Sequence, residues 1–161
     1  MRRCSLPPGL LPLAAAALLM AGCHHASTTT PQPKAEDPIV VFARTTFEAL
    51  AKGDPAVRDK LAWDRFNDKG RDVGKEWRAT AAGAPRQAFE QDFLTAFAAP
   101  YKFYPKGAHL IGWRLLSRSH GRSVVQADLG PTKIYFFVID TWRHHRFAGW
   151  SMSADDPVGV K

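Results

Sequence analysis

The chain has only two cysteines, Cys4 and Cys23, and both lie near its N-terminus. The rest of the sequence therefore has no thiol with which to form a disulfide. Small domains in oxidising compartments often depend on such bonds, so this one has to be held together by its apolar core. Residues 37–161 are long enough to bury a core of that kind as one domain.

The sequence also lacks the motifs that would identify a reaction. It has no glycine-rich phosphate loop, no Gly-x-Ser-x-Gly turn, no His-Glu-x-x-His pair and no cysteine beyond position 23 that could act as a nucleophile. His24 and His25 are adjacent imidazoles without a preorganised third ligand. We therefore expect neither a cofactor nor a metal ion.

Residues 1–22 have the layout of an export signal. Two arginines precede an apolar run over residues 10–21, which is too short to cross a hydrocarbon core of about 30 Å as a helix and ends in small residues. The ending Ala21-Gly22-Cys23 resembles the lipobox of bacterial lipoproteins, although Met20 stands where that family usually has leucine. The resemblance implies cleavage before Cys23 and its acylation. The alternative is an ordinary secretory signal with an incidental cysteine.

Residues 23–36 are small, polar and interrupted by proline, a composition that predicts a flexible tether. In some Gram-negative bacteria an aspartate directly after the lipidated cysteine marks retention in the inner membrane, and here that position holds His24. The resemblance therefore implies a cell-envelope protein anchored in a membrane, with the outer membrane facing the periplasm favoured. Nucleic acid is not an expected partner at that location.

The formal net charge of the whole chain is +7, and removal of the signal with its two arginines leaves +5. A basic domain beside a membrane could attract anionic lipids or other anionic envelope polymers. The basic residues are spread along the chain, which is also what ordinary solubility requires.

Residue periodicity predicts an α+β domain over 37–161, with N-terminal helices packed on a curved antiparallel sheet of about four strands. Apolar residues recur at helical spacing after each of Pro38, Pro55 and Pro85, and Phe89, Phe93 and Phe97 are expected in the core. Residues 67–84 predict an irregular connection, with one helical turn or short strand around residues 75–79. Strands are then predicted at about 111–115, 124–129 and 147–152, where the period changes from that of a helix. The nearly continuous apolar run at 134–142 predicts a central strand with apolar neighbours on both faces.

This order of elements, with the segments 49–54 and 140–150, resembles the nuclear-transport-factor-two-like superfamily over roughly residues 38–152. The resemblance implies a cone-like α+β fold. Members of the superfamily include isomerases and dehydratases as well as non-catalytic binding modules, so it leaves the function open.

Enzymes of that superfamily hold acid–base residues in an apolar interior, and the matching candidates here are Asp128, Asp140, Tyr135 and His109. Both aspartates lie near predicted turns, where an aspartate more often supports loop backbone or meets water. The other histidines of the domain, His120, His144 and His145, fall at predicted turns, and a zinc site there would need ligands from different hairpins.

Four further residues are candidates for binding. Tyr101 and Tyr104 flank the crossing from helix to strand, where they would line a cavity mouth or pack the edge of the core. Arg114 and Arg118 share strand parity, which predicts one mixed basic and apolar sheet face that either meets solvent or binds an anionic ligand or partner.

The sequence therefore favours an envelope lipoprotein whose domain binds a partner protein or a small apolar ligand without catalysis. Two alternatives stay open. One is a small isomerase-like or hydrolase-like enzyme that uses Asp140 or Asp128 as its base, and the other is a module that recognises anionic envelope polymers.

Overall fold

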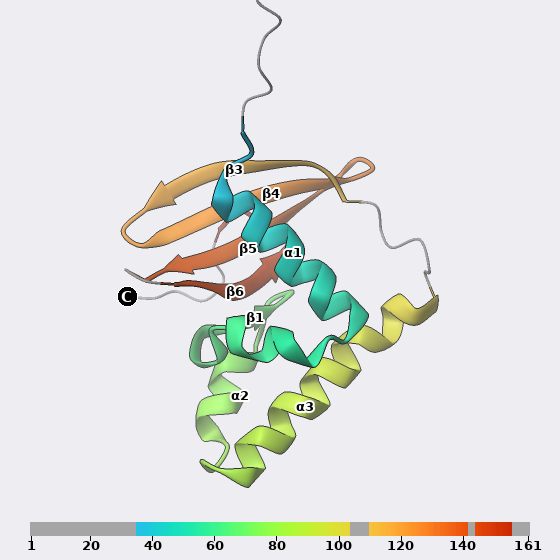
Figure 1. The fold of residues 1–161 in the computed structure, drawn as a ribbon, viewed down its shortest axis with the longest axis vertical. Coiled ribbons are helices and arrows are strands. Elements are labelled where there is room, and N and C mark those ends of the chain that lie inside the picture. The colour runs from blue at the N-terminus through green and yellow to red at the C-terminus, as the bar shows by residue number, and fades with distance from the viewer. Residues whose placement is uncertain (1–34, 104–109, 142–143, 156–161) are drawn as a thin grey trace, which may run out of the picture. The chain divides into compact units, whose positions relative to one another are not determined.

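The computed structural model describes residues 35–103, 110–141 and 144–155, which belong to one compact unit that begins at Ala35 (Figure 1). The fold is α+β, with helices packed on a six-stranded, mostly antiparallel sheet. The sheet is not strongly curled.

The helical part begins at Pro38, as the sequence predicts. Helix α1 (Pro38–Lys52) starts with proline after Asp37, whose side chain accepts a hydrogen bond of 2.9 Å from the backbone of Ile39, and it ends at Gly53 with φ 70°. Asp54 caps the next segment in the same way, but that segment is a 3₁₀ helix. The remaining helical elements are η1 (Pro55–Lys60), η2 (Trp63–Arg65), α2 (Val73–Ala79), α3 (Ala84–Ala98) and η3 (Ala99–Phe103).

The sheet has six strands rather than the four expected. The long ones are β3 (Ile111–Ser119), β4 (Arg122–Leu129), β5 (Thr132–Asp140) and β6 (His145–Ser151), and they form the predicted antiparallel meander. The short ones are β1 (Asn67–Asp68) and β2 (Arg71–Asp72). The strand order is β2-β1-β6-β5-β4-β3, with β1 parallel to β6. Two-residue strands have too little alternation to be predicted from sequence.

Aromatic residues fill the space between the helices and the sheet. Phe136 of β5 is fully buried, and its ring centroid lies 5.0 Å from that of Phe47 and 4.7 Å from that of Trp113. Phe93 and Phe97 of α3 are buried in the same cluster, and Phe89 packs against it. The prediction that the phenylalanine stripe belongs to the core is therefore confirmed.

Strand β5 is apolar on both faces, as its sequence predicts. Ile134, Phe136 and Val138 face the main core, whereas Phe137 belongs to a second cluster with Ala62 and Ala148. Partly buried Val124, Tyr135 and Ile139 pack against that second cluster.

A glycine permits the contact between β1 and β6. Gly149 has φ 125° and is paired with Asn67, whose side chain is buried and accepts a hydrogen bond of 2.7 Å from the backbone of Gly70. A Cβ atom at position 149 would overlap the backbone carbonyl oxygen of Asn67. Only glycine therefore allows the two backbones to approach this closely.

We predict that Gly149→Ala lowers the free energy of unfolding by at least about 2 kcal/mol, because it adds both backbone strain and a backbone clash. Gly130→Ala is the matched control: Gly130 also has positive φ, at 57°, but a Cβ there would meet no atom within 4 Å. The control should cost only about 1 kcal/mol. Urea denaturation measures both, and equal losses would contradict the proposed role of the close approach.

Candidate functional site

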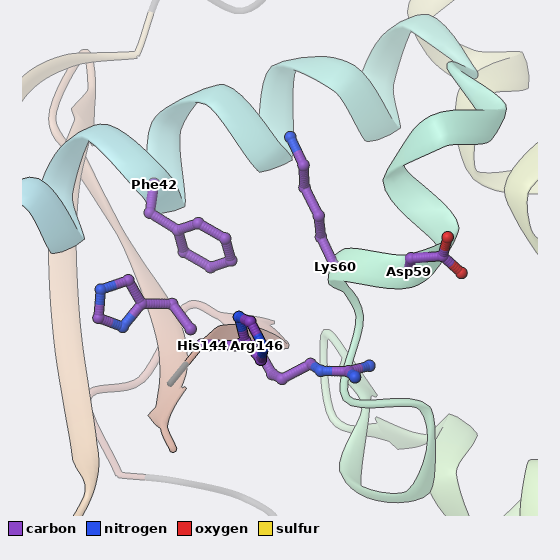
Figure 2. Close-up of a pocket in the computed structure, with 6 residues that line it drawn as sticks. Phe42, Asp59, Lys60, His144 and Arg146 are labelled. Carbon is purple, nitrogen blue, oxygen red and sulfur yellow. The ribbon is translucent and has the colours of Figure 1, made fainter. Parts of the chain in front are cut away.

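An open pocket of about 480 Å³ lies between the N-terminal half of α1, the end of η1 and the start of β6. We call it the basic pocket, and it is lined by Phe42, Asp59, Lys60, His144, His145 and Arg146. Its volume is within the range of small-molecule sites. In Figure 2, Phe42 points into the pocket and the carboxylate of Asp59 points away from it.

The charge of this pocket is mainly positive. Among the residues that the structure describes, neither Lys60 nor Arg146 has a carboxylate within ion-pair distance. Arg146 donates one hydrogen bond of 3.3 Å, from Nη1 to the backbone carbonyl of Leu61, which positions the guanidinium without neutralising it. Two cations without a carboxylate partner among the described residues attract an anion.

A carboxylate orients His145, one of the two histidines that line this pocket. Oδ1 of Asp140 lies 2.8 Å from Nδ1 of His145, and the Ser123 hydroxyl donates to Oδ2 of the same aspartate at 2.9 Å. The ring of Phe42 lies against the imidazole, with centroids 5.5 Å apart. Because an ionised carboxylate can only accept, Nδ1 of His145 carries a proton, and Nε2 has no hydrogen-bond partner among the described residues.

Asp140 is therefore a positioning residue in this geometry. Both of its carboxylate oxygens are engaged, by Ser123 and by His145. It lies at the end of β5 as predicted, but it supports its neighbour rather than presenting a free oxygen to a ligand.

The other candidate base, Asp128, lies on the opposite face of the sheet in an exposed set of ion pairs. It accepts from Gln126 at 3.0 Å, from Arg114 at 3.2 Å and from Lys133 at 3.5 Å. The hydrogen bonds from Gln126 and then Arg114 hold the pKa of Asp128 below its usual value. A carboxylate with a lowered pKa is a weak base, so this environment does not favour proton abstraction by Asp128.

Arg114 and Arg118 do not share a face, contrary to the sequence prediction. In the β3–β4 pairing, Arg114 lies opposite Gln126 and Arg118 lies opposite Ser123. Gln126 and Ser123 are three residues apart on β4, so their side chains point to opposite faces of the sheet, and the two arginines do the same. Register irregularities within β3 change the alternation between them. Arg118 lies 3.2 Å from Asp37 at the start of α1.

The remaining candidates lie apart from the basic pocket. Tyr135 packs in the second apolar cluster, and Tyr101 stacks on Phe97 with ring centroids 5.7 Å apart. Tyr101 thus packs the edge of the core, where burial raises its pKa. His109 and Tyr104 lie outside the described residues.

The histidines do not form a metal-binding group with other ligands in the described part of the chain. His120 occupies the β3–β4 turn with φ 48°, and its Nδ1 lies 2.6 Å from the hydroxyl of Ser119. No group of three or more His, Cys, Asp or Glu side chains is placed to hold a metal ion within residues 35–103, 110–141 and 144–155.

Sequence reasoning did not identify most of the basic pocket. It noted His144 and His145 only as turn residues, and it gave no role to Phe42, Lys60 or Arg146. These residues come from segments far apart in the chain, so no local motif unites them. The only usable signal was the run of basic residues at positions 143–146.

Comparison with known proteins gives no family assignment: no protein-family model matches the chain, and neither curated proteins nor solved structures provide a match. Within the described residues, none of the helices has the length and apolar character needed to cross a membrane.

We predict that Asp140→Ala lowers the free energy of unfolding by about 1–3 kcal/mol, because the buried Ser123 hydroxyl and His145 lose their shared acceptor. Asp59→Ala is the matched control, since Asp59 is exposed in the same pocket and accepts no hydrogen bond from a described residue. It should change stability by less than about 0.5 kcal/mol. Chemical denaturation at neutral pH compares the two, and similar losses would show that Asp140 does not organise the pocket.

Proposed function

We propose that this protein is a lipid-anchored envelope protein whose α+β domain binds an anionic ligand at the basic pocket without catalysis. One observation carries the proposal: Lys60 and Arg146, two cations without carboxylate partners in the described chain, line the same pocket as an oriented His145, although their charged ends point to different sides of it in Figure 2. The anionic group would belong to a small molecule or to a partner in the envelope.

The two alternatives have less support. Asp140 has both oxygens engaged and Asp128 is held in ion pairs, so neither aspartate is placed as a free catalytic base. A polymer-binding surface built on Arg114 and Arg118 is disfavoured because these residues lie on opposite sheet faces and each has an acidic partner.

A distant relationship to the nuclear-transport-factor-two-like superfamily remains part of the proposal. It is supported by the order of the elements, with helices first and then four consecutive antiparallel strands. The weak curl of the sheet departs from a cone. Phe136 packs against Phe47 and Trp113 between the helices and the sheet, so aromatic side chains fill the space that would be the interior of a cone.

The membrane anchor is proposed from the sequence. The basic and apolar segments before Ala21-Gly22-Cys23 support export and acylation, and His24 supports the outer membrane facing the periplasm if the organism is Gram-negative.

We predict that inorganic phosphate binds to the wild-type protein and that Lys60→Ala and Arg146→Ala each weaken this binding about tenfold, because each removes one charge-assisted contact. Lys133→Ala is the matched control, since Lys133 is an exposed cation whose partner is Asp128. Titration followed by the NMR shifts of the histidine rings measures the affinity, and rising salt should weaken it. If the control weakened binding as much, the affinity would reflect net charge and not this pocket.

We further predict that Cys23→Ser moves the protein from the membrane fraction to the soluble fraction, because it removes the acylation site. Fractionation of cells that express both forms measures this, and Cys4→Ser serves as the control. Membrane association that persists in the Cys23 variant would exclude the lipid anchor.

A further inference from the structure

A second pocket, of about 430 Å³, adjoins the basic pocket. We call it the indole pocket, and its lining includes Trp63, Trp77, Arg65, Ile139, Thr141 and Arg146. Arg146 lines both pockets, and the consecutive residues Asp59 to Arg65 line first one and then the other. The guanidinium of Arg146, bonded to the carbonyl of Leu61, therefore stands at their border.

The chemistry of the indole pocket differs from that of its neighbour. The indole N–H of Trp63 donates to the backbone carbonyl of Arg58 at 2.9 Å, and that of Trp77 donates to Oε1 of Glu90 at 2.8 Å. Both indole donors are used inside the protein. Trp63 is buried, and the guanidinium of Arg86 lies 4.0 Å from the ring centroid of the half-buried Trp77, so only the remaining carbon surface of Trp77 can meet a ligand. The half-buried side chain of Ile139 adds further apolar surface.

We propose that the two pockets form one elongated site for an anionic amphiphile, a molecule in which a negatively charged group is joined to a ring or acyl group. The anionic group lies in the basic pocket between Lys60 and Arg146, and the apolar group lies against Ile139 and Trp77 in the indole pocket. Arg146 contacts the junction. This inference rests on the proposed anion binding and adds the class of ligand.

The charge and the apolar surface at this site argue for such a ligand. A simple inorganic anion would use the cations but leave the apolar side of the indole pocket in water. A neutral apolar molecule would leave Lys60 and Arg146 without partners. A ligand that joins both chemical groups satisfies both parts of the site, and burial of apolar surface adds affinity to the electrostatic contact.

The test uses 1-anilinonaphthalene-8-sulfonate, a fluorescent aromatic anion, with the full chain carrying Cys23→Ser so that no lipid competes for the dye. Lys60→Ala tests the basic pocket and Ile139→Ala tests the indole pocket. Leu129→Ala is the control, because Leu129 is a partly exposed apolar residue that lines neither pocket. Circular dichroism establishes that each variant is folded.

We expect Lys60→Ala to weaken dye binding about tenfold and Ile139→Ala about fivefold, from the loss of a charge contact and of apolar contact area. Leu129→Ala should leave the affinity unchanged. The neutral analogue N-phenyl-1-naphthylamine should respond to Ile139→Ala but not to Lys60→Ala. Inorganic phosphate should displace the dye, and among these three variants only Lys60→Ala should weaken phosphate binding.

Dye binding that is insensitive to either Lys60→Ala or Ile139→Ala would overturn the elongated site. If phosphate binding still depended on Lys60 in that case, the proposed anion site would stand and only the amphiphile would be excluded. If phosphate failed to bind the unsubstituted pocket, the proposed function itself would fail.

Discussion

The contact between Phe47 of α1 and Phe136 of β5 fixes the helical layer on the sheet, and the candidate site depends on it. The two ring centroids lie 5.0 Å apart, and Phe47 also meets Phe97 of α3 and Trp150 of β6 edge to face. These ring contacts fix the rotation of α1 about its own axis and its position along the sheet. Phe42, between one and two turns earlier on the same helix, is thereby brought over His145.

The buried carboxylate of Glu90 holds η1, the element across the site from Phe42. Glu90 of α3 accepts hydrogen bonds from Arg58 of η1 and from the indole of Trp77 of α2, so one carboxylate connects three helical elements. Glu90 itself is buried while Arg58 keeps contact with solvent, an arrangement that limits the cost of burying the pair. Since η1 also carries Lys60, the bond from Arg58 to Glu90 holds in place the segment that lines both pockets.

Those elements of the fold that depend on neighbouring residues in the sequence could be predicted. Helical spacing after Pro38 located α1, and strand-like periodicity or a continuous apolar run located the four long strands, because these patterns need only neighbouring residues. The pairing of β1 with β6 depends instead on the lack of a side chain at Gly149 and on Asn67, far away in sequence. The faces of Arg114 and Arg118 were predicted wrongly because a bulge changes alternation without leaving a clear sequence mark.

The candidate site was much less predictable from the sequence, because it depends on which cations have a carboxylate nearby in the folded protein. Arg114 and Arg118 form ion pairs with Asp128 and Asp37, and exposed ion pairs of this kind contribute little to stability. Lys60 and Arg146 look no different in sequence, yet within the described residues the fold places them together without a carboxylate partner. The anion binding that we propose rests on this arrangement, and Arg146, which lines both pockets, is the residue that such a ligand would meet in each of them.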